Sequence, residues 1–159
     1  MKVIFAPWRM EFILGKREKG CVFCTRHRRR KDRPDLVVAR GKYSFVILNK
    51  YPYNSGHLMV VPNRHLCSLE DLTPEEMLEV FTLIQKSERV LKKAISPQGF
   101  NVGLNLGKAA GAGIDDHLHF HVIPRWFADT NFWPVISSTK SVPQHLMKTY
   151  DLLKRHWKY

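Results

Sequence analysis

The sequence predicts an α+β domain in which an antiparallel β-sheet meander is combined with one long helix and a C-terminal helix. Two observations predict this class. Short runs of apolar and β-branched residues are separated by turn residues, which is typical of successive strands. One long segment has apolar residues at helical spacing and begins at a clear helix-start signal. A chain of 159 residues is long enough for one domain with its own core.

The first three strands are predicted at residues 36–40, 43–48 and 57–62. A Gly-Lys turn at residues 41–42 separates the first two strands, so these are expected to form a hairpin. Residues 51–56 contain proline, asparagine, serine and glycine, which indicates a loop before the third strand.

The long helix is predicted to begin after Thr73. Thr73 is a good N-cap residue, Pro74 suits the first helical position, and Glu76 completes a capping box. One face is apolar, because hydrophobic residues recur at helical spacing: Met77, Val80, Phe81, Ile84, Leu91 and Ile95. A Ser-Pro pair at residues 96–97 is expected to end the helix.

The second half of the chain predicts two more strands and a second helix. The strands are expected at residues 100–106 and 117–124, with a glycine-rich loop at residues 107–113 between them. The helix is expected at residues 142–157.

The composition favours an anionic partner. The net charge is +12, and six cations crowd into residues 26–33. That run is either a solvated loop or an attractor for an anionic ligand, and it is too poor in aromatic residues to indicate nucleic-acid binding by itself. No apolar run reaches the roughly 18 residues of a membrane span, and the N-terminus has no signal peptide, so we expect a cytoplasmic protein without membrane contact.

Three histidines alternate with apolar residues in the segment His117-Leu-His119-Phe-His121. On a strand, alternate side chains point to the same face, so the three imidazoles are expected on one side and the apolar residues in the core. Three interpretations are open: structural histidines, a metal site of all three, or catalysis with one imidazole as nucleophile. We favour the third, because a neutral imidazole is a good nucleophile near pH 7.

The glycine-rich loop leads directly into the histidine segment. Gly107, Gly111 and Gly113 let backbone N–H groups approach phosphate oxygens closely. Glycines often only form a turn, but this position favours a phosphate-binding loop.

The segment HLHFHVI resembles the H-φ-H-φ-H-φ-φ motif of the histidine triad (HIT) superfamily. The segments GLNLGKAAGAGIDDHLHFHVIPRW, NSGHLMVVPNRH, APWRMEFI and DTNFWPVISSTKSVPQHL are similar to bacterial members of its Fhit-like branch. The resemblance implies a HIT-like fold and an enzyme that cleaves dinucleoside polyphosphates at an α-phosphate, as diadenosine tetraphosphate phosphorylase or hydrolase. The alternatives are a nucleoside phosphoramidate hydrolase or another HIT nucleotide hydrolase and, ranked below them, a nucleic-acid-binding or DNA-end-processing protein.

The resemblance also implies roles for individual residues. His119 would be the nucleophile, and His121 would contact the scissile phosphate or the leaving group. His57 would lie beside the triad. Substrate contacts are implied for four further residues: Asn49, Asn105, Gly111 and Gly113.

The pair Cys21 and Cys24 forms a CxxC, which needs two more ligands for a tetrahedral zinc site. In CxxC-bearing relatives these ligands correspond to His65 and His117, which implies a structural Cys2His2 zinc site. A reduced metal-free CxxC and a redox CxxC are the alternatives. The odd count of cysteines argues against a disulfide framework, and Cys67 is expected to be a small buried residue.

The resemblance implies a homodimer and no organic cofactor. We expect one domain over residues 1–159: an irregular basic N-terminal arm with the CxxC (1–33), a catalytic core (34–124) and a C-terminal extension with a helix (125–159). Aromatic residues at 8, 126, 127, 132 and 133 are expected to pack in the core or a dimer interface, with adenine stacking as the functional alternative.

Overall fold

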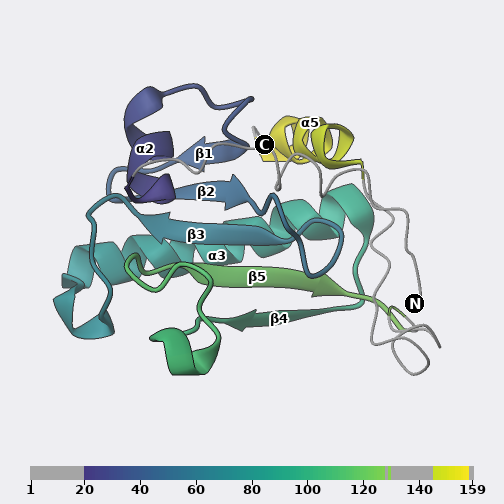
Figure 1. The fold of residues 1–159 in the computed structure, drawn as a ribbon. Helices are drawn as coiled ribbons and strands as arrows, with labels where there is room; N and C mark the ends of the chain where they lie inside the picture. Colours follow the sequence, from purple (N-terminus) through teal and green to yellow (C-terminus); the bar gives the residue numbers. More distant parts are fainter. Residues whose placement is uncertain (1–19, 128, 130–144, 158–159) are drawn as a thin grey trace, which may run out of the picture.

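A five-stranded antiparallel sheet forms the centre of the molecule and confirms the predicted α+β class (Figure 1). The computed structural model describes residues 20–127, 129 and 145–157. In the described residues the strand order is β1-β2-β3-β5-β4. The strands are β1 (Val37–Arg40), β2 (Ser44–Leu48), β3 (Leu58–Pro62), β4 (Gly99–Gly103) and β5 (Phe120–Arg125).

The hairpin of β1 and β2 forms as predicted, and β2 pairs with β3 over five residues from Ser44 to Leu48. Strands β2 and β3 are buried throughout, so this part of the sheet lies in the core. The loop between β2 and β3 rests on α3. Gly56 has a φ of +79°, a backbone conformation that favours glycine, and a Cβ there would lie 2.7 Å from Ile95 Cδ1 of α3.

Helix α3 (Pro74–Ile95) has the predicted boundaries and runs behind the sheet (Figure 1). The capping box is present: Thr73 Oγ1 accepts from the Glu76 N–H, and the Glu76 carboxylate accepts from the Thr73 N–H. Val80, Ile84 and Leu91 are buried, as the apolar pattern predicts, whereas Met77 and Phe81 remain exposed.

Helix α5 (Leu146–Trp157) packs against α3 and β1. The Tyr150 hydroxyl donates to the Val37 carbonyl at 2.9 Å, and the Lys154 ammonium donates to the Val38 carbonyl at 2.8 Å. The predicted start at residues 142–144 lies outside the described residues. Across the part of the chain that the structure describes, each helix is too short or too polar to cross a membrane.

The expectation of an irregular arm is wrong for helix α2 (Val22–Arg29), which lies in front of the sheet near β1 and β2 (Figure 1). Its sequence is mostly polar, and Phe23 is its single buried residue. The Phe23 ring packs against the rings of His117 and His119, with centroids 5.4 and 5.2 Å apart. This tertiary contact, which local propensity does not reveal, anchors the helix.

Two predicted strands are shorter than expected. The strand expected over residues 100–106 ends at Gly103, and the strand expected from residue 117 begins at Phe120. The Leu118 N–H pairs with the Leu66 carbonyl of the preceding loop, at 2.7 Å, and not with a sheet neighbour. His117 and His119 therefore precede β5, and only His121 lies on the strand.

Candidate active site and metal centre

The three histidines are buried, and the chain divides them between two groups. His119 and His121 lie together, with ring centroids 4.9 Å apart. The Nδ1 atom of His117 lies instead 3.2 Å from Cys21 Sγ. The expectation that all three imidazoles share one open face is thus replaced by a pair at the candidate catalytic position and one residue in a metal-ligand group.

The hydrogen bond of His119 fixes its tautomer. Its Nδ1 lies 2.8 Å from the His117 carbonyl oxygen. A carbonyl oxygen only accepts, so Nδ1 carries the proton and donates it. In the neutral ring, Nε2 then holds the lone pair, as a nucleophile requires.

His57 connects to His121 through a chain of fixed donors. The Tyr53 N–H donates to His57 Nδ1 at 3.1 Å, and the Asn49 amide lies 3.3 Å from the same atom. His57 Nε2 must therefore carry the proton, and it donates to His121 Nδ1 at 2.9 Å. His121 Nε2 is left as an N–H donor, buried and without a partner among the described residues.

Burial keeps both rings neutral. Burial, together with the nearby His121 and His119, lowers the pKa of His57 to about 3. Burial, with a smaller contribution from His119, lowers the pKa of His121 to about 4. At pH 7 His121 therefore presents a neutral N–H group to any ligand in front of it.

These pKa values predict a loss of stability in acid. The unfolded rings bind a proton near pH 6.5, whereas the folded rings of His57 and His121 stay neutral to about pH 3 and 4. The unfolded state then binds more protons between these limits. The free energy of unfolding should fall as the pH drops below 6.5, by up to about 1.4 kcal/mol per pH unit for each ring.

Denaturant titrations between pH 7 and pH 4.5 measure this slope. A His57→Gln variant should show a shallower slope than the wild type, because one of the two rings is gone. Equal slopes for the two proteins would show that His57 does not resist protonation in the fold.

A cleft of about 230 Å³ opens beside His121. It is lined by residues of the β2–β3 loop, of β4 and the segment after it, and of β5: Tyr53, Asn101, Val102, Gly103, Leu104, Asn105, His121 and Ile123. Asn105 thus lines the same cleft as His121. Asn49 lies at the far side of His57, and its Oδ1 accepts from the Tyr51 N–H at 2.9 Å.

The glycine-rich loop is exposed and contains the short 3₁₀ turn η2 (Lys108–Ala110). Gly107 and Gly111 have φ values of +78° and +83°, which other residues rarely adopt. Gly111 and Gly113 lie outside the residues that line the cleft.

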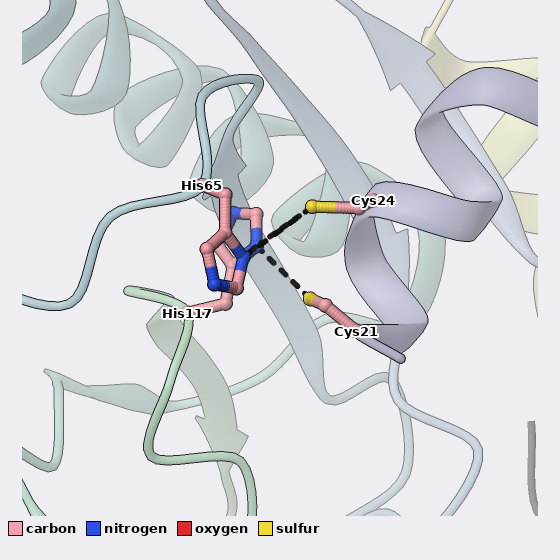
Figure 2. Close-up of side chains that lie close together, drawn as sticks. All are labelled: Cys21, Cys24, His65 and His117. Carbon is pink, nitrogen blue, oxygen red and sulfur yellow. Dashed lines mark hydrogen bonds between the residues drawn. The ribbon is translucent and has the colours of Figure 1, made fainter. Parts of the chain in front are cut away.

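Four side chains converge in the metal-ligand group formed by Cys21, Cys24, His65 and His117 (Figure 2). Their ligand atoms all lie within 4.8 Å of one another. The S···N distances are 3.2, 3.4 and 3.6 Å, and the N···N distance between the two histidines is 3.3 Å. Tetrahedral zinc with Zn–S of about 2.3 Å and Zn–N of about 2.05 Å separates such atoms by about 3.3–3.6 Å. The donor set and its spacing fit a zinc ion.

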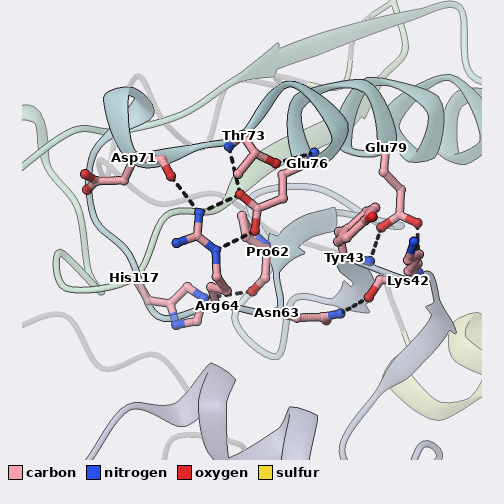
Figure 3. A network of polar contacts seen from close by, with 10 residues as sticks. All are labelled: Lys42, Tyr43, Pro62, Asn63, Arg64, Asp71, Thr73, Glu76, Glu79 and His117. Carbon is pink, nitrogen blue, oxygen red and sulfur yellow. Dashed lines mark hydrogen bonds and ion pairs between the residues drawn. The ribbon is translucent and has the colours of Figure 1, made fainter.

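Each ligand is oriented by its surroundings. The start of α2 supplies both cysteines, and His117 Nε2 donates to the Pro62 carbonyl at 3.0 Å, which leaves Nδ1 facing the sulfurs. His65 follows Arg64, whose guanidinium contacts both carboxylate oxygens of Glu76 at 2.6 Å (Figure 3). This pair ties the loop of His65 to the first turn of α3, and Arg64 holds the pKa of Glu76 below its usual range.

Other sequence expectations have mixed outcomes. Cys67 is exposed, so the expectation of a buried residue is wrong.

Trp126 is half-buried and donates from its indole to the Ser96 carbonyl, whereas Phe127 is exposed. The other three aromatic positions, 8, 132 and 133, lie outside the described residues. Tyr53 is a site residue that the sequence did not indicate; its place four residues before His57 is the only local signal.

Three histidines at alternate positions that lead into a strand of an antiparallel sheet, the middle one with its Nδ1 bonded to a backbone carbonyl, are typical of a histidine-triad protein. The comparison with protein families agrees: the model described as the HIT domain matches residues 30–128. The chain belongs to the HIT family.

Similar proteins include an AP-4-A phosphorylase of Mycobacterium tuberculosis, 52% identical over 126 residues, which cover 79% of this chain and 65% of that protein. An asymmetrical bis(5'-nucleosyl)-tetraphosphatase of Schizosaccharomyces pombe is 39% identical over 93 residues, 58% of this chain and 50% of that one. The match spans less than two thirds of either relative's length.

The fold has close counterparts among solved structures. A zinc-bound histidine triad family protein of Mycobacterium smegmatis superposes with a TM-score of 0.71. The superposition covers 87% of this chain and 94% of that one, at 24% identity. This likeness shows that the fold is shared.

Proposed function

We propose that the protein is a nucleotidyl transferase that cleaves dinucleoside polyphosphates, with diadenosine tetraphosphate as the reference substrate. The observation that carries this proposal is the orientation of His119, whose Nδ1–H is held by a carbonyl so that Nε2 holds a lone pair. The similarity to the AP-4-A phosphorylase of M. tuberculosis supports the substrate class.

The reaction proceeds in two displacements. His119 Nε2 forms a bond to the α-phosphorus while the bridging P–O bond breaks, and ATP departs with the electron pair. An oxygen of inorganic phosphate or water then attacks the adenylyl-His119 intermediate. The P–N bond breaks, its electron pair returns to Nε2, and ADP or AMP is released.

His121 stabilises the charge that develops in both steps. Its Nε2–H is a neutral donor beside His119, and His57 keeps it oriented through Nδ1. A preorganised donor in a buried site favours a phosphoryl oxygen that gains negative charge.

We assign the remaining substrate contacts to Asn49, Asn105, Gly111 and Gly113. Asn105 lines the cleft with His121, which supports a contact to the α-phosphate. Asn49 is adjacent to His57, which supports a ribose contact. The left-handed backbone at Gly111 supports a loop whose N–H groups turn toward phosphate oxygens.

We propose that Cys21, Cys24, His65 and His117 hold a structural zinc ion. All four positions of a tetrahedral ion are filled by protein, so the metal supplies structure and leaves no open position for substrate. The ion ties α2 to the segment before β5, next to the nucleophile.

We propose a cytoplasmic homodimer. Three apolar side chains on one surface of α3 are exposed in the single chain, namely Met77, Leu78 and Phe81, and Val102 is exposed on the edge strand β4. Such surfaces favour pairing with a second copy. Sedimentation that gives a monomer at micromolar concentration would contradict the dimer.

The cytoplasmic location is supported by the cysteines, which form no disulfide among the described residues and so suit a reducing compartment. Cell fractionation tests this location.

Incubation with diadenosine tetraphosphate, with and without inorganic phosphate, tests the function. ADP plus ATP formed only with phosphate is the result expected of a phosphorylase, which we favour. AMP plus ATP under both conditions would identify a hydrolase. If the compound survives in both, the substrate class is wrong, and nucleoside phosphoramidates become the substrates to assay.

A further inference from the structure

An ion pair at the end of β5 joins the two sides of the cleft beside His121. Arg125 donates from Nε and Nη2 to the two carboxylate oxygens of Asp129, at 2.6 and 2.9 Å. The Asp129 side chain is only 7% exposed. A bidentate pair with a buried carboxylate is stronger and better oriented than an exposed pair.

Asp129 holds the loop before His57. The Asn54 amide donates to Asp129 Oδ2 at 2.8 Å and to the Pro124 carbonyl at 3.0 Å. The backbone carbonyl of Asn54 in turn accepts from the His57 N–H at 3.2 Å. The same loop carries Tyr53, whose N–H fixes the tautomer of His57.

Arg125 holds the opposite side of the cleft. Its Nη1 donates to Asn101 Oδ1 at 2.6 Å, and Asn101 on β4 lines the cleft with Tyr53 and His121. Because Oδ1 is engaged, the Asn101 amide nitrogen remains as a donor for a substrate oxygen.

We propose that Arg125 and Asp129 are positioning residues that fix both walls of the cleft and so keep His57 oriented as the donor to His121. The pair acts on the histidines through Asn54 and Asn101. Its effect on turnover rests on the proposed function, whereas its effect on the orientation of His57 does not.

Asp129→Asn tests the proposal, since it keeps the shape of the side chain and removes its charge. With diadenosine tetraphosphate, kcat should fall about 10- to 100-fold, more than KM rises, because reacting groups are displaced and not removed. In the free protein, the imidazole ¹⁵N signals of His57 and His121 should move away from the single-tautomer values of the wild type. Asp129→Glu, which keeps the carboxylate, should recover part of the wild-type kcat and part of the wild-type ¹⁵N signals.

Asp151→Asn is the matched control. It breaks another bidentate pair, in which Arg33 Nε and Nη2 contact Asp151 at 3.1 and 3.0 Å on the exposed surface of α5. Its kcat and histidine spectrum should equal those of the wild type.

Arg125→Gln is the second variant should Asp129→Asn not fold, because it removes a side chain that is 42% exposed and breaks the bonds to both Asp129 and Asn101. Wild-type kcat and unchanged histidine signals in the folded variants would overturn the proposal. If the wild type itself does not turn over the dinucleotide, the proposed function fails, and the spectra of the free proteins still decide the positioning role.

Discussion

Replacement of His119 by alanine is expected to abolish turnover while the fold persists. The substitution removes the only atom that forms the covalent bond in the proposed reaction, so the rate should fall by roughly 10³-fold or more. Steady-state turnover of diadenosine tetraphosphate measures the loss, and circular dichroism checks the fold. Wild-type protein that is quenched during turnover in denaturant at alkaline pH, where the P–N bond survives, should carry an adenylyl group detectable by mass spectrometry, and the variant should carry none.

His145→Ala is the control for a general effect of losing a histidine. His145 lies directly before α5, is exposed, and contacts the Lys148 N–H at 3.4 Å. Full activity of this variant with loss of activity in His119→Ala is the expected pattern. Retained turnover and an adenylyl adduct in His119→Ala would rule out the assigned nucleophile.

Replacement of Cys24 by serine is expected to lower metal content and thermal stability more than it lowers the rate of the folded protein. Cys24 Sγ lies 3.4 and 3.6 Å from the Nδ1 atoms of His65 and His117, so its loss opens the ligand set. A ligand that binds only the folded state stabilises it by about 3 kcal/mol at 100-fold excess over its Kd, which corresponds to roughly 6–12 °C in Tm.

Cys67→Ser provides the matched control, because Cys67 is a free exposed thiol outside the metal-ligand group. Zinc per chain and Tm should match the wild type in this variant and fall together in Cys24→Ser. Unchanged zinc content in Cys24→Ser would refute the ligand assignment. Cys21→Ser should behave as Cys24→Ser does, since Cys21 Sγ lies 3.2 Å from His117 Nδ1.

The fold was largely predictable because its sheet and long helix carry local signals. The capping box at Thr73 and Glu76 and the turn after β1 are encoded by adjacent residues. Helix α2 carries no such signal, because it depends on the contact of Phe23 with histidines about a hundred residues later. Tertiary contacts of that kind override local propensity.

Site residues that belong to a sequence motif were predictable, whereas residues whose contacts depend on the conformation of a loop were not. The four members of the metal-ligand group were expected from the resemblance, and the structure brings them together. The roles of Tyr53 and Asp129 could not be read from the sequence, because each depends on which backbone group or side chain a loop turns toward. The displacement of His117 from β5 likewise follows from one long-range hydrogen bond, at Leu118.

The direction of the hydrogen bonds around His121 has a consequence for the second half of the proposed reaction. Because Nε2 already carries a proton, His121 offers no lone pair there to deprotonate an incoming group. Water needs a base before it attacks, whereas phosphate arrives already ionised near neutral pH. The site should therefore choose among acceptors by their acidity: anionic oxyacids that share the charge and size of phosphate should outcompete neutral alcohols and water.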